Sequence, residues 1–72
     1  METGALQRFG DNVRAARRSR GWTQEDLAYK TGLATVQVSR IERGAREIRL
    51  TTLLRLLAAF EAQPQELLDG LY

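Results

Sequence analysis

Two short amphipathic helices joined at a glycine are predicted by residues 23–43, the part of the chain that most constrains its fold. Thr23 suits the N-cap of a helix, and Asp26 three residues later resembles the acid of a capping box. The first helix then spans 24–31, and Gly32 supplies the left-handed backbone that ends it. A second helix follows at once. This spacing predicts a helix-turn-helix.

The second helix, from about residue 34, has an apolar face and a polar face. Val38 and Ile41 lie three residues apart and share the inward face. At 100° per residue, other side chains point away from that face or flank it, namely Thr35, Val36, Ser39, Arg40 and Arg43. Val36 is either an ordinary exposed aliphatic residue or a contact for a thymine methyl group in a major groove. Its polar and basic neighbours favour the second interpretation, and therefore DNA.

Composition excludes several other functions. A chain of 72 residues has room for one domain, over 1–72, and buries only about 60% of its unfolded surface. Cysteine and histidine are absent, and neither serine stands in a nucleophile context, so we expect no enzyme, no metal and no cofactor. No apolar run approaches about 18 residues and no secretory leader is evident, so we expect a cytoplasmic protein without membrane contact. No residues remain for a sensor of a small-molecule ligand.

Basic residues are concentrated in the body of the chain. Residues 1–60 carry a net charge of +5 and residues 61–72 carry −3. Ten of the 11 basic residues are arginine, whose guanidinium can clamp guanine or phosphate with two hydrogen bonds. Besides Arg17, five arginines lie outside the helix-turn-helix and its following loop: Arg8, Arg14, Arg18, Arg20 and Arg55. We assign most of these five to an ordinary solvated face and leave Arg14 and Arg18 open as contacts for a flanking phosphate.

Helices are also predicted on both sides of residues 23–43, so the fold class is all-α. A helix over 4–19 places apolar residues on one stripe at spacings of three and four, namely Leu6, Phe9, Val13 and Ala16. A fourth helix spans about 51–60 and is rich in leucine. A fifth begins at Pro64, a residue suited to a first helical turn.

The chain resembles the DNA-binding domains of phage repressors, Cro proteins and XRE-type regulators. The resemblance runs through the segment FGDNVRAARRSRGWTQEDLAYKTGLATVQVSRIERG and continues through LTTLLRLLAAF. Among these regulators the chain is most similar to the controller proteins of restriction-modification systems, which share TQEDLAYK and IER. The resemblance implies a compact five-helix, lambda-repressor-like domain with the helix-turn-helix at its second and third helices. Ile48 and Arg49 stand where similar proteins have Pro-Ser, which leaves the start of the fourth helix and any DNA contact of Arg49 open.

The resemblance also implies roles for single residues. Base edges would be read by Thr35, Val36, Ser39 and Arg40. The DNA backbone would be contacted by Gln24, Gln37, Arg43 and Arg46, with Gln24 also bracing the second helix of the motif. Arg17 and Glu42 would form a structural ion pair between the first and third helices, since a partly buried ion pair fixes geometry without reading DNA.

The last two helices carry more apolar surface than a monomer of this size buries. Candidates for a dimer face are Leu56, Leu68, Leu71 and Tyr72, a choice supported by resemblance to proteins that pair through the last helix. The alternative, that these residues complete the monomer core, stays open, above all for Leu68. A two-fold dimer would place two recognition helices roughly 34 Å apart and would read a pseudo-palindrome.

The predicted function is a sequence-specific transcriptional regulator that acts as a homodimer on double-stranded DNA, with RNA polymerase as a further candidate partner. By resemblance, it would control its own gene and that of a neighbouring restriction endonuclease. The alternative is an antitoxin or another protein-interaction module built on the same fold. Neighbouring genes and co-purifying proteins would distinguish the two.

Overall fold

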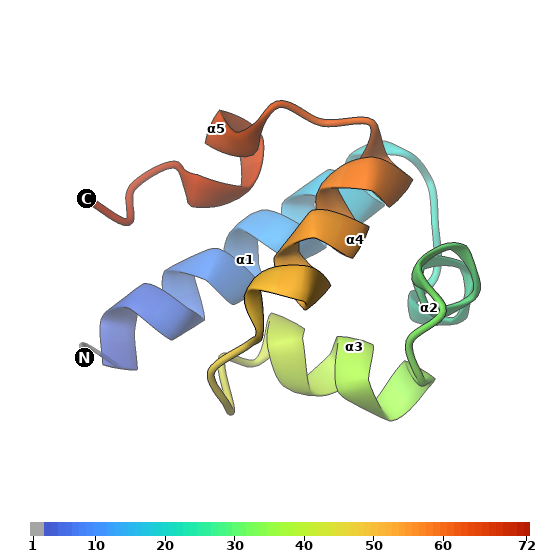
Figure 1. Cartoon of the computed structure of the whole chain (residues 1–72), viewed down its shortest axis with the longest axis horizontal. Coiled ribbons are helices and arrows are strands. Elements are labelled where there is room, and N and C mark those ends of the chain that lie inside the picture. Colours follow the sequence, from blue (N-terminus) through green and yellow to red (C-terminus); the bar gives the residue numbers. More distant parts are fainter. Residues whose placement is uncertain (1–2) are drawn as a thin grey trace.

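The protein, described by a computed structural model over residues 3–72, is built from five α-helices, and no strand occurs in that part of the chain (Figure 1). Their bounds are α1 Thr3–Ser19, α2 Gln24–Thr31, α3 Thr35–Glu42, α4 Leu50–Phe60 and α5 Pro64–Leu68. The all-α prediction is confirmed, and the predicted helix starts agree within one residue. Residues 1 and 2, which the predicted domain includes, lie outside the described residues. None of the described helices is long and apolar enough to span a bilayer.

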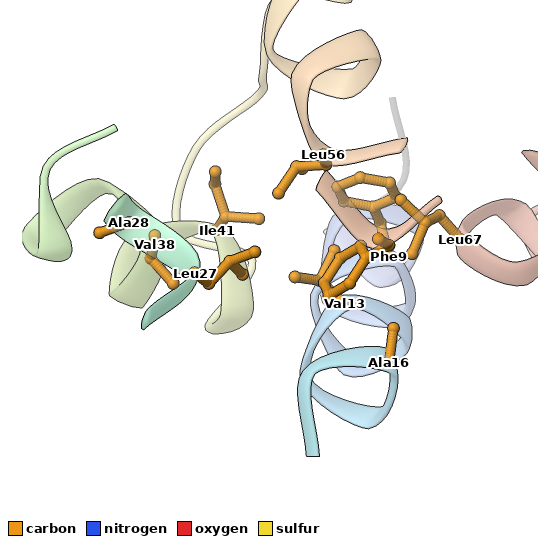
Figure 2. Packing of buried hydrophobic residues seen from close by; sticks show 10 residues of the cluster. Phe9, Val13, Ala16, Leu27, Ala28, Val38, Ile41, Leu56 and Leu67 are labelled. Carbon is orange, nitrogen blue, oxygen red and sulfur yellow. The ribbon is translucent and has the colours of Figure 1, made fainter. Parts of the chain in front are cut away.

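One apolar core joins all five helices. In Figure 1, α1 runs behind α4, while α2 and α3 lie to the other side of the molecule from α5 and the two termini. Figure 2 shows the side chains that converge between them: Phe9, Val13 and Ala16 from α1, Leu27 and Ala28 from α2, Val38 and Ile41 from α3, Leu56 from α4 and Leu67 from α5. Three of the four residues in the apolar stripe predicted for the first helix, Phe9, Val13 and Ala16, therefore face the core, whereas Leu6 is half-buried outside it.

Helix α4 turns a different face to the core than the sequence suggested. Leu56 and Phe60, one turn apart, are buried, whereas Leu50 and Leu54 are 69% and 54% exposed. The prediction that Leu56 belongs to a dimer face is wrong, because its side chain is fully buried in the core, where it points from α4 toward Ile41 of α3, and has no surface left for a partner (Figure 2).

Local hydrogen bonds set the ends of α2. The Thr23 hydroxyl accepts from the Asp26 backbone N–H at 3.0 Å, and the Asp26 carboxylate accepts from the Thr23 N–H at 2.8 Å. The hydrogen bond that the carboxylate accepts from the Thr23 backbone, and next one from the Thr23 side chain, lower the pKa of Asp26. Gly32 ends the helix with φ +76°, and its N–H donates to Ala28 O at 2.9 Å. The predicted capping box and left-handed glycine are both confirmed.

Helices α1 and α3 approach closely at Gly10, a contact that was not predicted from the sequence. A Cβ atom on Gly10 would lie 2.5 Å from the carbonyl oxygen of Ile41 and 2.6 Å from that of Glu42. Backbone atoms cannot rotate aside, so only glycine fits unless α3 moves away. This contact positions the C-terminal end of α3 against α1.

Three of the five arginines in the group considered for a solvated face bind other parts of the chain. Arg8 pairs with Asp69 at 3.3 Å, Arg14 pairs with Glu42 at 3.3 Å, and Arg20 pairs with Glu66 at 2.9 Å. The Arg20 guanidinium also lies 4.8 Å from the centre of the Phe60 ring. Arg20 is half-buried, so the solvated-face prediction is wrong for it, whereas Arg8 stays exposed within its ion pair. Arg14, which the sequence left open as a phosphate contact, reaches the buried Glu42.

Candidate nucleic-acid interface

Helix α3 presents the four predicted base-contact residues on its outer side. Its inner side is fixed by Val38, which is fully buried, and Ile41. Consequently Thr35, Val36 and Arg40 are exposed and Ser39 is half-buried. The Val36 side chain is 52% exposed, although it is aliphatic and gains nothing from contact with water. This face combines hydroxyl, methyl and guanidinium groups, the set that reads base edges in a major groove.

Gln37 has a structural task at the start of α3. Its Oε1 accepts a hydrogen bond from the backbone N–H of the N-cap residue Ala34 at 2.9 Å, the half of a capping box that does not depend on the N-cap side chain. The amide nitrogen of the exposed Gln37 is the end suited to a phosphate, because a phosphate oxygen needs a donor. This capping role was not predicted from the sequence.

The Glu42 carboxylate, at the last turn of α3, is fully buried and joins three helices. Arg17 of α1 donates to it twice, from Nε to Oε2 at 2.7 Å and from Nη2 to Oε1 at 3.0 Å. Gln24, the first residue of α2, donates from Nε2 to Oε1 at 3.1 Å. The predicted ion pair between Arg17 and Glu42 is confirmed, and Gln24 braces α3 as the resemblance implied.

Glu42 stays ionised in this setting. Burial raises the pKa of the carboxyl, but hydrogen bonds from Arg17 and Gln24, the charge of Arg17 and a bond from Arg14 together hold it below its usual value. The bond to Glu42 likewise raises the pKa of Arg17. The result is a charged cluster that locks the C-terminal end of α3 to α1 and α2.

A basic cleft runs beside α3, between that helix, the following loop and the start of α4. Its volume is about 450 Å³. Four arginines are among the residues that line it: Arg40, Arg46, Arg49 and Arg55. Arg43 and Arg46, predicted to contact the DNA backbone, are exposed, and Arg43 caps the end of α3. Arg49, whose role the sequence left open, lies in the same basic setting.

The remaining dimer candidates differ in exposure. Tyr72 is 97% exposed, while Leu68 and Leu71 are half-buried and line an apolar hollow of about 200 Å³ with Leu6 and Leu53. Leu50 and Leu54 are more exposed than either leucine and were not predicted for this face. Their spacing of four residues, which places both on one side of α4, was the sequence signal that could have identified them as exposed.

A family model described as helix-turn-helix matches residues 13–67. The chain is 39% identical over 62 residues to the control protein C.BamHI of Bacillus amyloliquefaciens, a match that covers 85% of this chain and 76% of that protein.

Two crystal structures show the same fold. One is the restriction-modification controller protein C.AhdI from Aeromonas hydrophila, with a TM-score of 0.83, 39% identity and coverage of 86% of this chain and 94% of that one. The other is the clp gene regulator ClgR from C. glutamicum, with a TM-score of 0.82, 25% identity and coverage of 89% and 83%. The likeness therefore extends over most of the described helices.

Proposed function

The chain belongs to the helix-turn-helix family and is a DNA-binding regulator of the controller-protein type; on this premise we propose that it reads a specific operator as a homodimer. The observation that carries the proposal is the outer face of α3. Thr35, Val36 and Arg40 are exposed there on a helix whose other side is locked into the core. A rigid helix with free hydroxyl, methyl and guanidinium groups suits direct readout of base pairs.

In this proposal Arg40 donates to a guanine, and Val36 packs on a thymine methyl group. Gln24, Arg43 and Arg46 hold the phosphates on either side of the groove and so fix the register of α3. The basic cleft next to α3 supports the same arrangement, because its arginines add positive charge where a DNA strand would pass.

The proposed dimer uses the apolar surface that one copy leaves uncovered. Leu50 and Leu54 lie one turn apart on α4 and both are more than half exposed, an unusual state for leucine pairs on a small domain. Leu68, Leu71 and Tyr72 remain in the proposed face, and Leu56 does not. A second copy related by a two-fold axis would place two α3 helices roughly 34 Å apart.

The proposed biological setting is a restriction-modification system. Its support is the similarity to C.BamHI and to C.AhdI, each of which is described as a control or controller protein. The likeness to ClgR shows that the fold also serves another kind of regulator, so the setting needs its own test. An endonuclease gene and a methyltransferase gene beside this one would support it, whereas a small toxin that co-purifies would favour the antitoxin alternative.

Selection of bound sites from random duplex DNA tests the function directly. We expect enrichment of a pseudo-palindrome whose half-sites are about 10 base pairs apart from centre to centre. The same selection with Arg40→Ala should lose preference at one base pair of each half-site and keep the rest. Enrichment of a single, non-palindromic half-site would contradict the dimer. Absence of any enrichment would contradict sequence-specific binding.

A further inference from the structure

Arg14 of α1 lies at the edge of the cluster that holds Gln24 and α3 in place. Its Nε donates to Glu42 Oε1 at 3.3 Å, the same oxygen that accepts from Gln24 Nε2 at 3.1 Å. The ends of the Arg14 and Gln24 side chains are therefore neighbours, although the two residues belong to different helices.

The donors of Arg14 are mostly unused, in contrast with those of Arg17. Arg17 binds Glu42 through Nε and Nη2 and donates from Nη1 to the carbonyl oxygen of Trp22 at 2.8 Å. Its side chain is only 11% exposed. Arg14 uses Nε alone within the described chain, and its side chain is 36% exposed. Both Nη groups of Arg14 thus remain available for a ligand at the surface.

The cation of Arg14 offsets negative charge close to Gln24. Glu42 carries a negative charge beneath Gln24, and Glu25 follows Gln24 closely enough for its charge to raise the pKa of Arg17. With Arg17 and Arg14 included, the four charges cancel. Without Arg14 the other three would sum to −1, which disfavours a phosphate beside them.

From this geometry we propose that Arg14 is a further contact for a DNA phosphate, positioned by the buried Glu42 carboxylate beside Gln24. The proposal rests on the DNA-binding function proposed above. Glu42 Oε1 orients Arg14 by its bond to Nε, while the Nη edge and the second N–H of Gln24 Nε2 donate to phosphate oxygens. Because the protein already holds both donors, less side-chain entropy is lost when DNA binds.

The salt dependence of DNA binding distinguishes this role from a purely structural one. Each phosphate contact contributes about 0.9 to the slope of log K against log salt concentration. We expect Arg14→Ala to make the slope less negative by about 0.9 per bound subunit, on a duplex that contains the selected site and on a scrambled duplex alike. Arg14→Lys, which keeps the charge, should restore most of the slope.

Arg8→Ala is the matched control. It removes the same charge from the same helix, and Arg8 pairs with Asp69 at the same 3.3 Å distance. We expect it to change the slope far less. If Arg14→Ala does not fold, as judged by circular dichroism at 222 nm, then Arg14→Gln repeats the test, because it lacks the charge and keeps an amide donor for Glu42.

A slope change for Arg14→Ala or Arg14→Gln no larger than that for Arg8→Ala would overturn the proposal. That result would leave the proposed function intact, provided that the unmodified chain binds the selected duplex more tightly than the scrambled one. If the unmodified chain binds neither duplex, the proposed function itself fails, and the Arg14 proposal fails with it.

Discussion

Replacing the buried Glu42 carboxylate by an amide should destabilise the protein strongly. In Glu42→Gln the charge that Arg17 faces is gone, and one of the two oxygens becomes an NH₂ group. Arg17 donates at 2.7 and 3.0 Å to the two oxygens, so at least one of its N–H groups would face another donor. Breaking a buried ion pair by removing one partner costs about 3–5 kcal/mol.

The lower end of that range, about 3 kcal/mol, is the expected loss of unfolding free energy, because the remaining amide oxygen still accepts one bond. For a domain of this size, Tm falls by roughly 4–8 °C per kcal/mol, so the variant should melt at least about 12 °C below the unmodified protein. Urea titration followed by the fluorescence of Trp22, the single tryptophan, measures the free energy. Glu47→Gln, which removes the charge of an exposed residue, is the control.

The loss of unfolding free energy in Glu42→Gln should also depend on pH. The pKa of Glu42 is lowered in the folded state, so its contribution to stability is complete above the ordinary glutamate pKa and is lost as pH falls through the lowered value. The difference between the unmodified protein and Glu42→Gln should therefore be constant near neutral pH and shrink in acid. Asp26 and Glu66 also have lowered pKa values, but both proteins contain them, so their effects cancel. A loss below about 1 kcal/mol at pH 7 would refute the structural role of the cluster.

Three other substitutions test the packing of the core and the proposed dimer. Gly10→Ala would normally favour a helix by about 0.5–1 kcal/mol, but its Cβ would meet carbonyl oxygens of α3 at 2.5 and 2.6 Å, so we expect a net loss of about 1–3 kcal/mol in urea titrations. A stabilised Gly10→Ala would show that α1 and α3 are not this close. Leu56→Ala should cost about 2–5 kcal/mol of folding free energy. Leu54→Ala should instead weaken self-association in sedimentation equilibrium, and an unchanged dimer Kd would remove Leu54 from the interface.

The helix-turn-helix was predictable because its signals are local. Thr23, Asp26 and Gly32 act on neighbouring backbone groups, so their residue types alone locate the ends of α2. The residues on the outer face of α3 were predictable for the same reason. Once Val38 and Ile41 are buried, the helical repeat leaves only one orientation for Arg40.

Features that depend on distant contacts were not predictable. Helix α4 has leucines at so many positions that its pattern does not specify which side is inward, and Leu56 was assigned to the wrong face. Packing of Leu56 and Phe60 into the core shared by the five helices decides the matter. The bond between Arg14 and Glu42 joins residues 28 apart and leaves no periodic signal. Gly10 did carry a hint, because a glycine within a predicted helix often marks a close approach of two backbones.

Sequence-specific reading by Arg40 is the central claim, and the affinities of two variants on two duplexes test it most directly. On the duplex that contains the selected site, Arg40→Ala should lose about 1–3 kcal/mol more binding free energy than on a scrambled duplex, at one fixed salt concentration. Arg46→Ala, which removes a proposed phosphate contact, should lose similar amounts on both. Equal losses for Arg40→Ala on the two duplexes would contradict the account, because a guanine contact cannot be worth the same where its guanine is absent.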